Sequence, residues 1–250
     1  MRRWSYARTD IGRKRPHNED SFLADDTLGL YAVADGVGGH AKGEVASQEA
    51  VEQLFNWVKG EEALLAEYLS QPDEEHIMKL RRLVESAVQS ACYMLYGMAE
   101  LEPEQRGMST TISALLLCGN VGIVGQVGDS RVYRLREGVI EQLTEDHTLL
   151  NYKLKHGLIS PEQAARAPGK NVITRAVGHK EYVEVDTLHV DVEPGDRFLL
   201  CSDGLHGYFD NNELRDLMAK EPASAVDEMI DLANNRGGKD NITVVLVLVL

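Results

Sequence analysis

Residues 111–135 read TISALLLCGNVGIVGQVGDSRVYRL, and this stretch decides the fold. It holds three short runs of apolar or alternating residues, at 111–117, 121–127 and 131–135, which are separated only by the turn-forming segments CGN and GDS. Parallel strands need long crossover connections, so strands that follow one another this closely pair antiparallel. The stretch therefore predicts an antiparallel sheet in the middle of the chain.

The sequence on either side adds helices and further strands. An apolar run at 29–34 predicts a strand, and apolar residues with three- and four-residue spacing predict helices over 51–58 and 77–98. Later come strand-like runs at 172–173, 182–190 and 197–201, helical patterns at 211–220 and 223–235, and a strand rich in valine and leucine at 242–250. This order differs from alternating βαβ units, and it predicts an α+β fold in which helices pack on antiparallel sheets.

The segment at about 146–175 departs from this pattern. It is polar, contains Pro161 and Pro168, and has only short helical potential. We interpret it as an excursion from the sheet that forms a mobile flap. Because the chain has no repeat and no Pro- or Ser-rich linker, we expect residues 1–250 to form a single domain.

The composition excludes several classes of function. Among the 250 residues, Lys and Arg number 26 and Asp and Glu number 40, which gives a net charge of −14. A chain this acidic is unsuited to bind nucleic acid or an anionic membrane surface, because both need cations. Three cysteines without a C-x-x-C pair indicate reduced thiols, and no apolar run suits a signal peptide or a membrane span. We expect a cytoplasmic protein with no nucleic-acid or membrane partner.

Carboxylates recur where strands are predicted to end. Asp35, Asp129 and Asp203 each follow an apolar run, and Asn18-Glu19-Asp20 and Asp240-Asn241 add further acids. A single Asp-Gly pair is most simply a turn. If these strand ends converge, however, so many carboxylates must repel one another or take up protons unless cations lie between them. A pair of hard divalent ions, Mg²⁺ or Mn²⁺, suits such oxygen ligands, whereas the scattered histidines and cysteines do not indicate zinc.

Six short motifs follow one another along nearly the whole chain. They are Arg15-x-x-Asn18-Glu19-Asp20, Asp35-Gly36-Val37-Gly38-Gly39-His40, Gly107-Met108-Ser109-Thr110-Thr111, Gly128-Asp129-Ser130-Arg131, Ser202-Asp203-Gly204-Leu205 and Gly238-Lys239-Asp240-Asn241-Ile242-Thr243. In this order they resemble the motifs of the PP2C-type metal-dependent Ser/Thr protein phosphatases, and the bacterial single-domain members are the most similar. Each motif is weak by itself, but six in the family's order form a specific pattern.

The resemblance implies a fold and a pair of metal sites. The fold is a four-layer αββα sandwich of two antiparallel sheets flanked by helix pairs, in agreement with the pattern above. The cofactors are Mn²⁺ or Mg²⁺. Asp35 would bridge two ions, Asp203 and Asp240 would complete one site, and the Gly36 carbonyl with Glu19, acting through water, would serve the other.

Further roles follow from the same resemblance. Bacterial members often hold a third ion, for which Asp129 and Asp203 are the matching positions. Arg15 would bind the substrate phosphate, although without the motif it would be read as one solvated charge within Arg-Lys-Arg. Asp20 would orient metal-bound water.

The general acid stays open. Eukaryotic relatives carry a histidine directly after the Asp-Gly pair, whereas this chain has Val37 there and its nearest histidine is His40. A histidine in such a loop can donate a proton or merely hold the turn, and metal-bound water is the other candidate donor.

The activity implied is hydrolysis of phosphoserine and phosphothreonine on proteins by a water that two metals activate. The partners implied are phosphoprotein substrates and a bacterial Ser/Thr kinase that the enzyme opposes, and we expect a monomer. A catalytically weak sensor or interaction domain is the alternative within the family, and the intact carboxylate set together with Arg15 argues against it.

Other chemistries lack support in the sequence. Residues 36–41 fit the dinucleotide fingerprint G-x-G-x-x-A, but Asp35 would repel the pyrophosphate and no second strand with a terminal acid follows. No cysteine has an arginine six positions later, as the loop of a cysteine-based phosphatase requires, and no D-x-D-x-T motif occurs.

Overall fold

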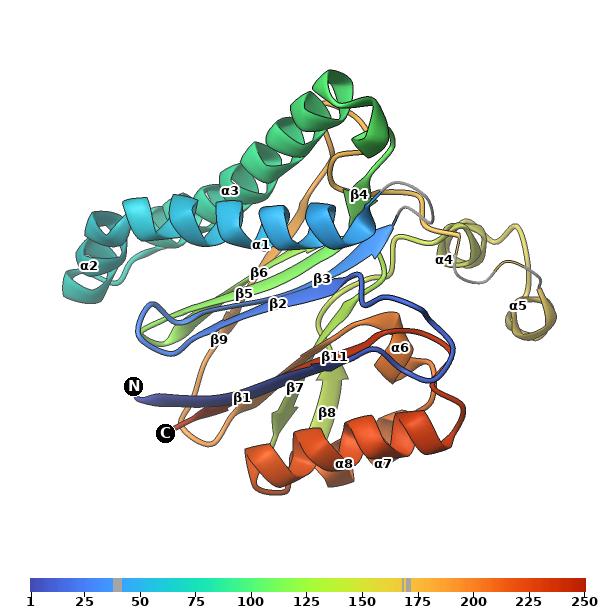
Figure 1. Cartoon of the computed structure of the whole chain (residues 1–250). Coiled ribbons are helices and arrows are strands. Elements are labelled where there is room, and N and C mark those ends of the chain that lie inside the picture. Colours follow the sequence, from blue (N-terminus) through green and yellow to red (C-terminus); the bar gives the residue numbers. More distant parts are fainter. Residues whose placement is uncertain (38–41, 168, 170–171) are drawn as a thin grey trace.

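The computed structural model of the chain describes residues 1–37, 42–167, 169 and 172–250. Its strands form two antiparallel sheets that lie face to face, with helices on the outside (Figure 1). The first sheet has the strand order β1-β11-β10-β7-β8, and the second has the order β2-β3-β5-β6-β9, with the short β4 paired to β3.

The first sheet joins both ends of the chain. It contains β1 (Arg3–Asp10), β11 (Ile242–Val249), β10 (Arg197–Cys201), β7 (Arg131–Arg136) and β8 (Val139–Gln142). β1 and β11 pair antiparallel with Arg3 opposite Val249, so the two termini lie side by side (Figure 1). The valine- and leucine-rich strand of the sequence is therefore an interior strand, between β1 and β10.

The second sheet holds the central stretch of the sequence. It contains β2 (Asp20–Asp25), β3 (Leu30–Val37), β4 (Ser109–Thr110), β5 (Ile112–Cys118), β6 (Val121–Val127) and β9 (Asp186–Asp191). The tight turns after β5 and β6 lie where the sequence predicts them. The turn after β6, however, carries the chain across to β7 in the other sheet, so Asp129 lies at the junction of the two sheets.

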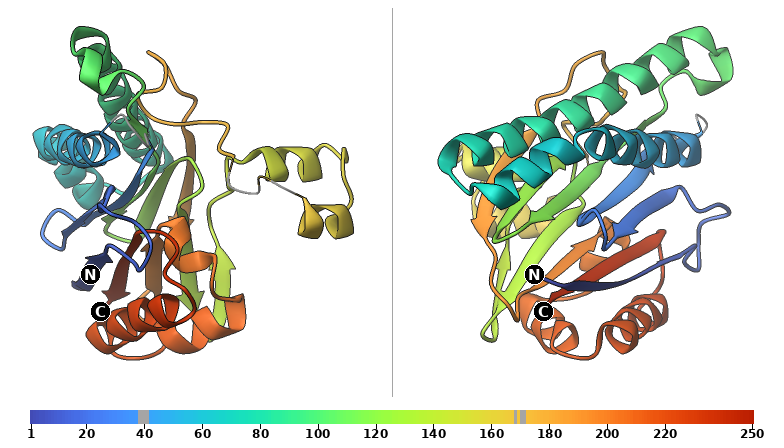
Figure 2. Two further views of the ribbon diagram at one scale, coloured as in Figure 1. Left: turned by 45° about the vertical axis from the view of Figure 1, so that its right-hand side comes forward. Right: turned by 90° about the vertical axis from the view of Figure 1, so that its left-hand side faces the viewer.

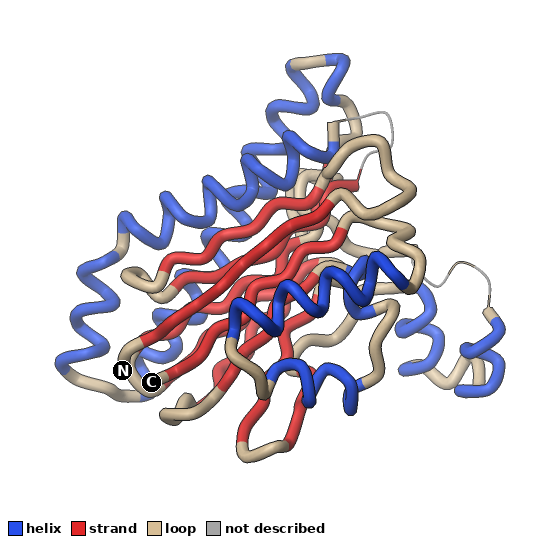
Figure 3. The backbone as a smooth tube through the Cα atoms, turned by 60° about the horizontal axis from the view of Figure 1, so that its bottom comes forward, coloured by secondary structure: helices blue, strands red, loops and turns tan. Residues whose placement is uncertain are grey.

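Helices cover the outer face of each sheet. α1 (Gly43–Gly60), α2 (Glu62–Ser70) and α3 (Glu74–Leu101) lie over the second sheet, and α7 (Asn211–Met218) and α8 (Pro222–Asn235) lie over the first (Figure 2). Figure 3 shows the strands gathered in the interior with helices on both sides. This arrangement is the αββα sandwich that the family resemblance implies. Among the described helices, none has both the length and the apolar character needed to span a membrane.

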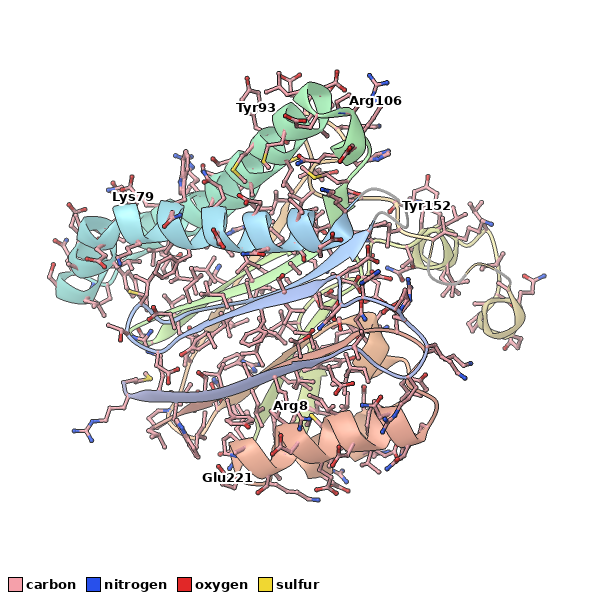
Figure 4. The ribbon with its side chains drawn as sticks, viewed as in Figure 1. Arg8, Lys79, Tyr93, Arg106, Tyr152 and Glu221 are labelled. Atoms are coloured by element: carbon pink, nitrogen blue, oxygen red, sulfur yellow. The ribbon has the colours of Figure 1, made fainter. Side chains whose placement is uncertain are left out.

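Alternation along each strand explains why three apolar layers form. In β11, Ile242, Val244 and Leu246 pack under α7 and α8, whereas Val245 and Val247 face the other sheet. Because both faces of the strand are buried, its sequence is apolar throughout. At the outer edge of the sheet, Arg8 on β1 reaches α8, where its Nη1 donates to Asp227 Oδ1 at 2.8 Å (Figure 4).

The structure corrects the sequence prediction in several further places. Residues 182–185 are not part of a strand, and only Asp186–Asp191 is. The backbone before β9 is instead held by α3, because Gln89 accepts from the Val183 N–H at 3.2 Å and Cys92 Sγ donates to the Lys180 carbonyl at 3.1 Å. The predicted strand at 172–173 is a single bridge between Ile173 and Thr148. A helix that the sequence did not predict, α2, follows α1 after one residue.

The flap leaves the sandwich between β8 and β9. Two short helices, α4 (Leu149–Lys155) and α5 (Pro161–Arg166), stand away from the sheets, as Figure 2 shows, and Figure 4 shows Tyr152 on this projecting part. The proline that helped to define the flap, Pro161, is the first residue of α5, a position that suits its missing N–H. Pro168 lies outside the described residues.

Candidate active site

A cavity of about 310 Å³ opens at one end of the sandwich. Its walls are formed by Arg15, Glu19, Asp35, Gly36, Val37, Thr111, Asp129, Ile173, Asp203 and Asp240. The structure therefore brings together every residue to which the sequence assigns a metal, and Arg15 with them. Asp20, the remaining candidate, lies behind the wall and is 7% exposed.

Both sheets contribute to the cavity. Asp35 lies near the end of β3 and stands opposite Asp20 on the neighbouring β2. Asp203 lies two residues after the end of β10, as the first residue of the short helix α6 (Asp203–His206), and Asp240 lies two residues before β11, the strand that pairs with β10 in the first sheet. Because the strand ends of both sheets meet here, carboxylates that are far apart in sequence share one space.

The backbone of Asp35 is fixed by two threonines. Its N–H donates to Thr111 Oγ1 at 2.9 Å, and its carbonyl accepts from Thr110 Oγ1 at 2.9 Å. Thr111 Oγ1 also lies 2.9 Å from Ser130 Oγ, next to Asp129. The sequence motif that contains the two threonines carried no predicted role, and the structure shows that they hold Asp35 in place.

Asp20 is held at one oxygen only. Its Oδ2 accepts from Ser202 Oγ at 2.8 Å and from Thr243 Oγ1 at 2.7 Å. Its Oδ1 is buried and accepts no hydrogen bond from any residue that the structure describes. Burial raises the pKa of Asp20 to about 7 against the opposing effect of the two hydroxyls, and the charges of Asp203 and Asp240 add to the rise.

The loop that carries Arg15 is anchored by Asn241. Asn241 Oδ1 accepts from the Glu19 N–H at 2.9 Å, and its Nδ2 donates to the carbonyls of Ile11 and His17 at 3.0 and 2.9 Å. One side chain thus fixes both ends of the loop. At the cavity wall Arg15 Nη2 donates to Asp240 Oδ2 at 2.7 Å.

The glycines after two of the aspartates have a packing role. A Cβ on Gly36 would stand 2.3 Å from the Gly43 carbonyl oxygen and 2.5 Å from that of Glu19, and a Cβ on Gly204 would stand 1.9 Å from that of Asn241. No larger residue fits at these distances. The two Asp-Gly pairs are therefore places where one backbone segment closely approaches another, and not only turns.

The electrostatics of the cavity are dominated by unbalanced negative charge. The pKa of Asp35 is raised well above its usual range by its enclosed position and then by Asp20, Asp203, Asp129 and Asp240. Burial followed by the charge of Asp203 raises the pKa of Asp129 to about 7. Burial and the neighbouring Asp240 raise that of Asp203 to about 6, although Arg15 opposes the rise.

The donor set fits hard divalent cations. Each cavity side chain that could ligate offers oxygen, and the buried Oδ1 of Asp20 adds an acceptor without a described partner. Within the described residues, no three His, Cys, Asp or Glu side chains already surround one point as ligands do.

A second cavity of about 380 Å³ shares Asp129 and Asp203 with the first and lies against the base of the flap. In its wall, His206 Nε2 lies 2.9 Å from the Asp129 carbonyl. Because a carbonyl only accepts, Nε2 carries the proton. Burial, with a smaller contribution from nearby Arg131, lowers the pKa of His206 to about 4, so the ring is neutral at pH 7.

The base of the flap is tied to the turn that carries Asp129. Arg131 forms two hydrogen bonds to Asp146, from Nε at 2.8 Å and from Nη2 at 2.6 Å. The His147 N–H donates to the Gly128 carbonyl at 2.8 Å, and the Gly128 N–H donates to His147 Nδ1 at 3.2 Å. No sequence pattern indicated these roles, because each depends on a partner in another element. His40, the candidate general acid, lies outside the described residues.

Comparison with known proteins identifies the family of this chain. Residues 12–246 match the family model of protein phosphatase 2C. The chain is 40% identical over 245 residues to the serine/threonine phosphatase stp of Listeria monocytogenes, and the match covers 96% of this chain and 93% of that protein.

Solved structures show the same fold. A crystal structure of the Mycobacterium tuberculosis serine/threonine phosphatase PstP/Ppp superposes with a TM-score of 0.87 at 35% identity, covering 100% of this chain and 99% of that one. The catalytic domain of PstP in complex with two manganese ions gives a TM-score of 0.83 at 34% identity, covering 98% and 97% of the two chains. With its motifs, its sandwich and its carboxylate-lined cavity, the chain belongs to the protein phosphatase 2C family of serine/threonine phosphatases.

Proposed function

We propose that this protein hydrolyses phosphoserine and phosphothreonine monoesters on proteins, in a reaction that depends on Mn²⁺ or Mg²⁺. The observation that carries the proposal is the convergence of Glu19, Asp35, Asp129, Asp203 and Asp240 on one cavity beside an arginine. So many carboxylates suit a site that binds cations and, through them, a phosphate dianion.

The residues divide into ligands for two or three ions. Asp35 would lie between two ions, Asp203 and Asp240 would hold one of them, and the Gly36 carbonyl with Glu19 would serve the other. Asp129, together with Asp203, would take a third. When bound, such ions supply Lewis-acid chemistry, since they withdraw charge from phosphate oxygens and lower the pKa of coordinated water.

Two further residues act on the substrate and on the water. Arg15 has a planar guanidinium at the cavity wall that can donate two parallel hydrogen bonds to a phosphate. Asp20 has one oxygen fixed by Ser202 and Thr243, which leaves Oδ1 to orient a water or accept its proton.

The wider setting is also part of the proposal. Residues 1–250 would act as one phosphatase domain with a flap at about 146–175, which is supported by a family match that spans both sides of the flap. We propose that the protein works as a monomer in the cytoplasm and reverses a bacterial Ser/Thr kinase, as expected for a phosphatase of phosphoproteins.

The decisive experiment measures phosphate release from a phosphothreonine peptide with Mn²⁺ and with EDTA. We expect release that requires the metal and that falls about 10²–10³-fold or more in Asp203→Asn, because a ligand loses its charge. Asp216→Asn, at an exposed position on α7, is the matched control and should keep full activity. Release that persists in EDTA, or full turnover in a folded Asp203→Asn protein, would contradict the assignment. Mn²⁺ binding without turnover would instead favour the alternative within the family, a catalytically weak sensor or interaction domain.

A further inference from the structure

A run of positive charge borders the candidate active site. Residues 13–17 read Arg-Lys-Arg-Pro-His and contain no acid, although the chain as a whole carries a net charge of −14. Arg13, Lys14, Arg15 and His17 are all exposed. Arg15 lines the cavity, so the Cα atoms of Arg13, Lys14 and His17 lie within about 7 Å of the Cα atom of a residue in its wall.

A second segment adds to this charge. The Arg13 N–H donates to the Gly238 carbonyl at 2.7 Å, and a Cβ on Gly238 would stand 2.8 Å from Arg13 Cγ. The loop after β1 therefore packs directly on the loop before β11, and Figure 1 shows both at the end of the sandwich that carries the flap. Lys239, the next residue along, is also exposed.

The charged residues near this segment differ in whether they form ion pairs. Arg15 pairs with Asp240 at 2.7 Å, and Arg236 pairs with Glu213 at 2.6 Å. Asp10, the acid nearest in sequence to Arg13, accepts from the Gly12 N–H and from Asn234 Nδ2. Within the part of the chain that the structure describes, Arg13, Lys14 and Lys239 form no ion pair. We call these three residues the cationic rim.

We propose that the cationic rim binds acidic side chains that flank the phosphorylated residue of a protein substrate. The proposal rests on the proposed phosphatase function, because it needs the phosphate at Arg15. Cα atoms two residues apart lie at most about 7 Å from each other, both in the loop and in an extended peptide. A phosphate at Arg15 therefore brings peptide positions two or three residues away within reach of Arg13 and Lys14.

The size of the expected effect follows from the exposure of the rim. An exposed ion pair contributes little alone, but several carboxylates near three unpaired cations should raise kcat/KM by roughly tenfold at low ionic strength. Salt at about 500 mM, where the screening length is only a few ångströms, should remove most of that preference.

The test compares phosphothreonine peptides of equal length that carry Asp, Gln or Lys at the flanking positions. Both kcat/KM with Mn²⁺ and binding by fluorescence anisotropy are measured, each at about 50 mM and about 500 mM salt. The variant combines R13Q, K14Q and K239Q, in which Gln keeps the carbon atoms that pack near Gly238. The control combines K59Q, K79Q and K220Q, which lie on other elements. Activity is also measured on p-nitrophenyl phosphate, a small substrate that has no flanking residues for the rim to bind.

We expect the wild type and the control to prefer the Asp peptide, and the rim variant to lose that preference while it keeps its activity on p-nitrophenyl phosphate. Equal kcat/KM and equal binding for the three peptides in the wild type would overturn the proposal, as would a preference that survives in the rim variant. Failure of the phosphatase function has a different result, namely no metal-dependent release from any substrate. In that case the binding measurement alone decides whether the rim selects acidic peptides.

Discussion

Asp35 is a residue that the proposed function requires and that destabilises the fold when no metal is bound. Four other aspartates raise its pKa through their charges, in addition to the effect of its enclosed position. A carboxylate in such a place destabilises the fold unless a proton or a cation neutralises it. A binding site for cations requires such a carboxylate, and residues with strongly shifted pKa values cluster at functional sites.

Asp35→Asn should therefore have opposite effects on stability and on activity. Without metal at pH 8, removal of the charge should raise the unfolding midpoint by about 2–4 °C, the shift that 1 kcal/mol produces in a chain of this size. Phosphate release and the stabilisation that Mn²⁺ gives to the wild type should both be lost. Calorimetry with EDTA and with Mn²⁺ measures these effects, and Asp216→Asn serves as the control. A metal-free variant less stable than the wild type would show that the Asp35 carboxylate stabilises the fold more than charge repulsion destabilises it.

Sequence reasoning found the acids of this site but not the residues that hold them. Asp35, Asp203 and Asp240 could be selected because each lies beside a glycine or an asparagine at the predicted end of a strand. Asn241 was visible only as part of a motif. Its hydrogen bonds go to Ile11, His17 and Glu19, more than 220 residues away, so no local pattern could reveal its role.

Among the elements, strands were predicted best where both faces are buried. β5, β6 and β11 are apolar in almost every position, and their turns are short. The segment before β9 was predicted wrongly as a strand. Its apolar and polar residues alternate as in a strand, but this pattern does not show whether a neighbouring strand or the side chains of a helix form hydrogen bonds with its backbone. Gln89 and Cys92 of α3 do so here.

The flap is the element whose connection to the site the sequence could not show. His147 holds both backbone groups of Gly128, directly before Asp129, and its Nε2 lies 3.1 Å from Asp186 Oδ2 on β9. Since the Gly128 N–H donates to Nδ1, the neutral ring carries its proton on Nε2 and donates it to Asp186. Arg175 Nη1, which lies 3.2 Å from Nε2, then donates to Asp186 Oδ1 at 2.6 Å and not to the ring. At the other end of the flap, the Thr174 N–H donates to the His147 carbonyl at 2.7 Å. One histidine thus links both ends of the flap to the turn of a proposed ligand.

His147→Ala should loosen the turn that carries Asp129. It should thereby lower turnover and Mn²⁺ affinity, although His147 is not itself a proposed ligand. We expect a roughly 10–100-fold loss in turnover, as for other residues that position metal ligands, and a higher Mn²⁺ concentration for half-maximal activity. His147→Asn, whose Oδ1 can replace Nδ1 as acceptor, should lose less. Hydrogen exchange of the 127–130 and 146–175 backbone amides provides a readout independent of activity. His189→Ala, at an exposed position on β9, is the control. Unchanged exchange and unchanged Mn²⁺ dependence in His147→Ala would exclude this role.

At the scale of the whole molecule, the candidate site lies where the two sheets meet. Glu19, Asp20 and Asp35 belong to the second sheet or the loop that leads into it, and Asp203 and Asp240 flank strands of the first. The apolar layer between the sheets sets how far apart these groups lie. Cations bound between them would therefore connect the two halves of the sandwich, so that metal binding and global stability are linked.

The pH dependence of stability tests this linkage. The folded protein raises the pKa of Asp20 and Asp129 to about 7, that of Asp203 to about 6 and that of Asp35 well above its usual value of 3.8. The folded state thus binds protons more tightly than the unfolded chain. The stability from these groups is fully present below pH 3.8 and is lost as the pH rises through 6 to 7. His206, whose pKa is lowered to about 4, acts in the opposite sense but only below its ordinary value of 6.5.

Between pH 6.5 and 8 the aspartates therefore determine the trend. In EDTA, the unfolding midpoint should fall across this range, and Mn²⁺ should restore it most at the high end, where the carboxylates are ionised and bind the cation without first losing a proton. Asp129→Asn should flatten the slope, whereas Asp216→Asn should not, which separates the cavity from the general repulsion of an acidic protein. A midpoint that is constant or rises with pH in EDTA would mean that these aspartates are already ionised in the folded protein at pH 6.5. The cavity would then be charged before any metal arrives.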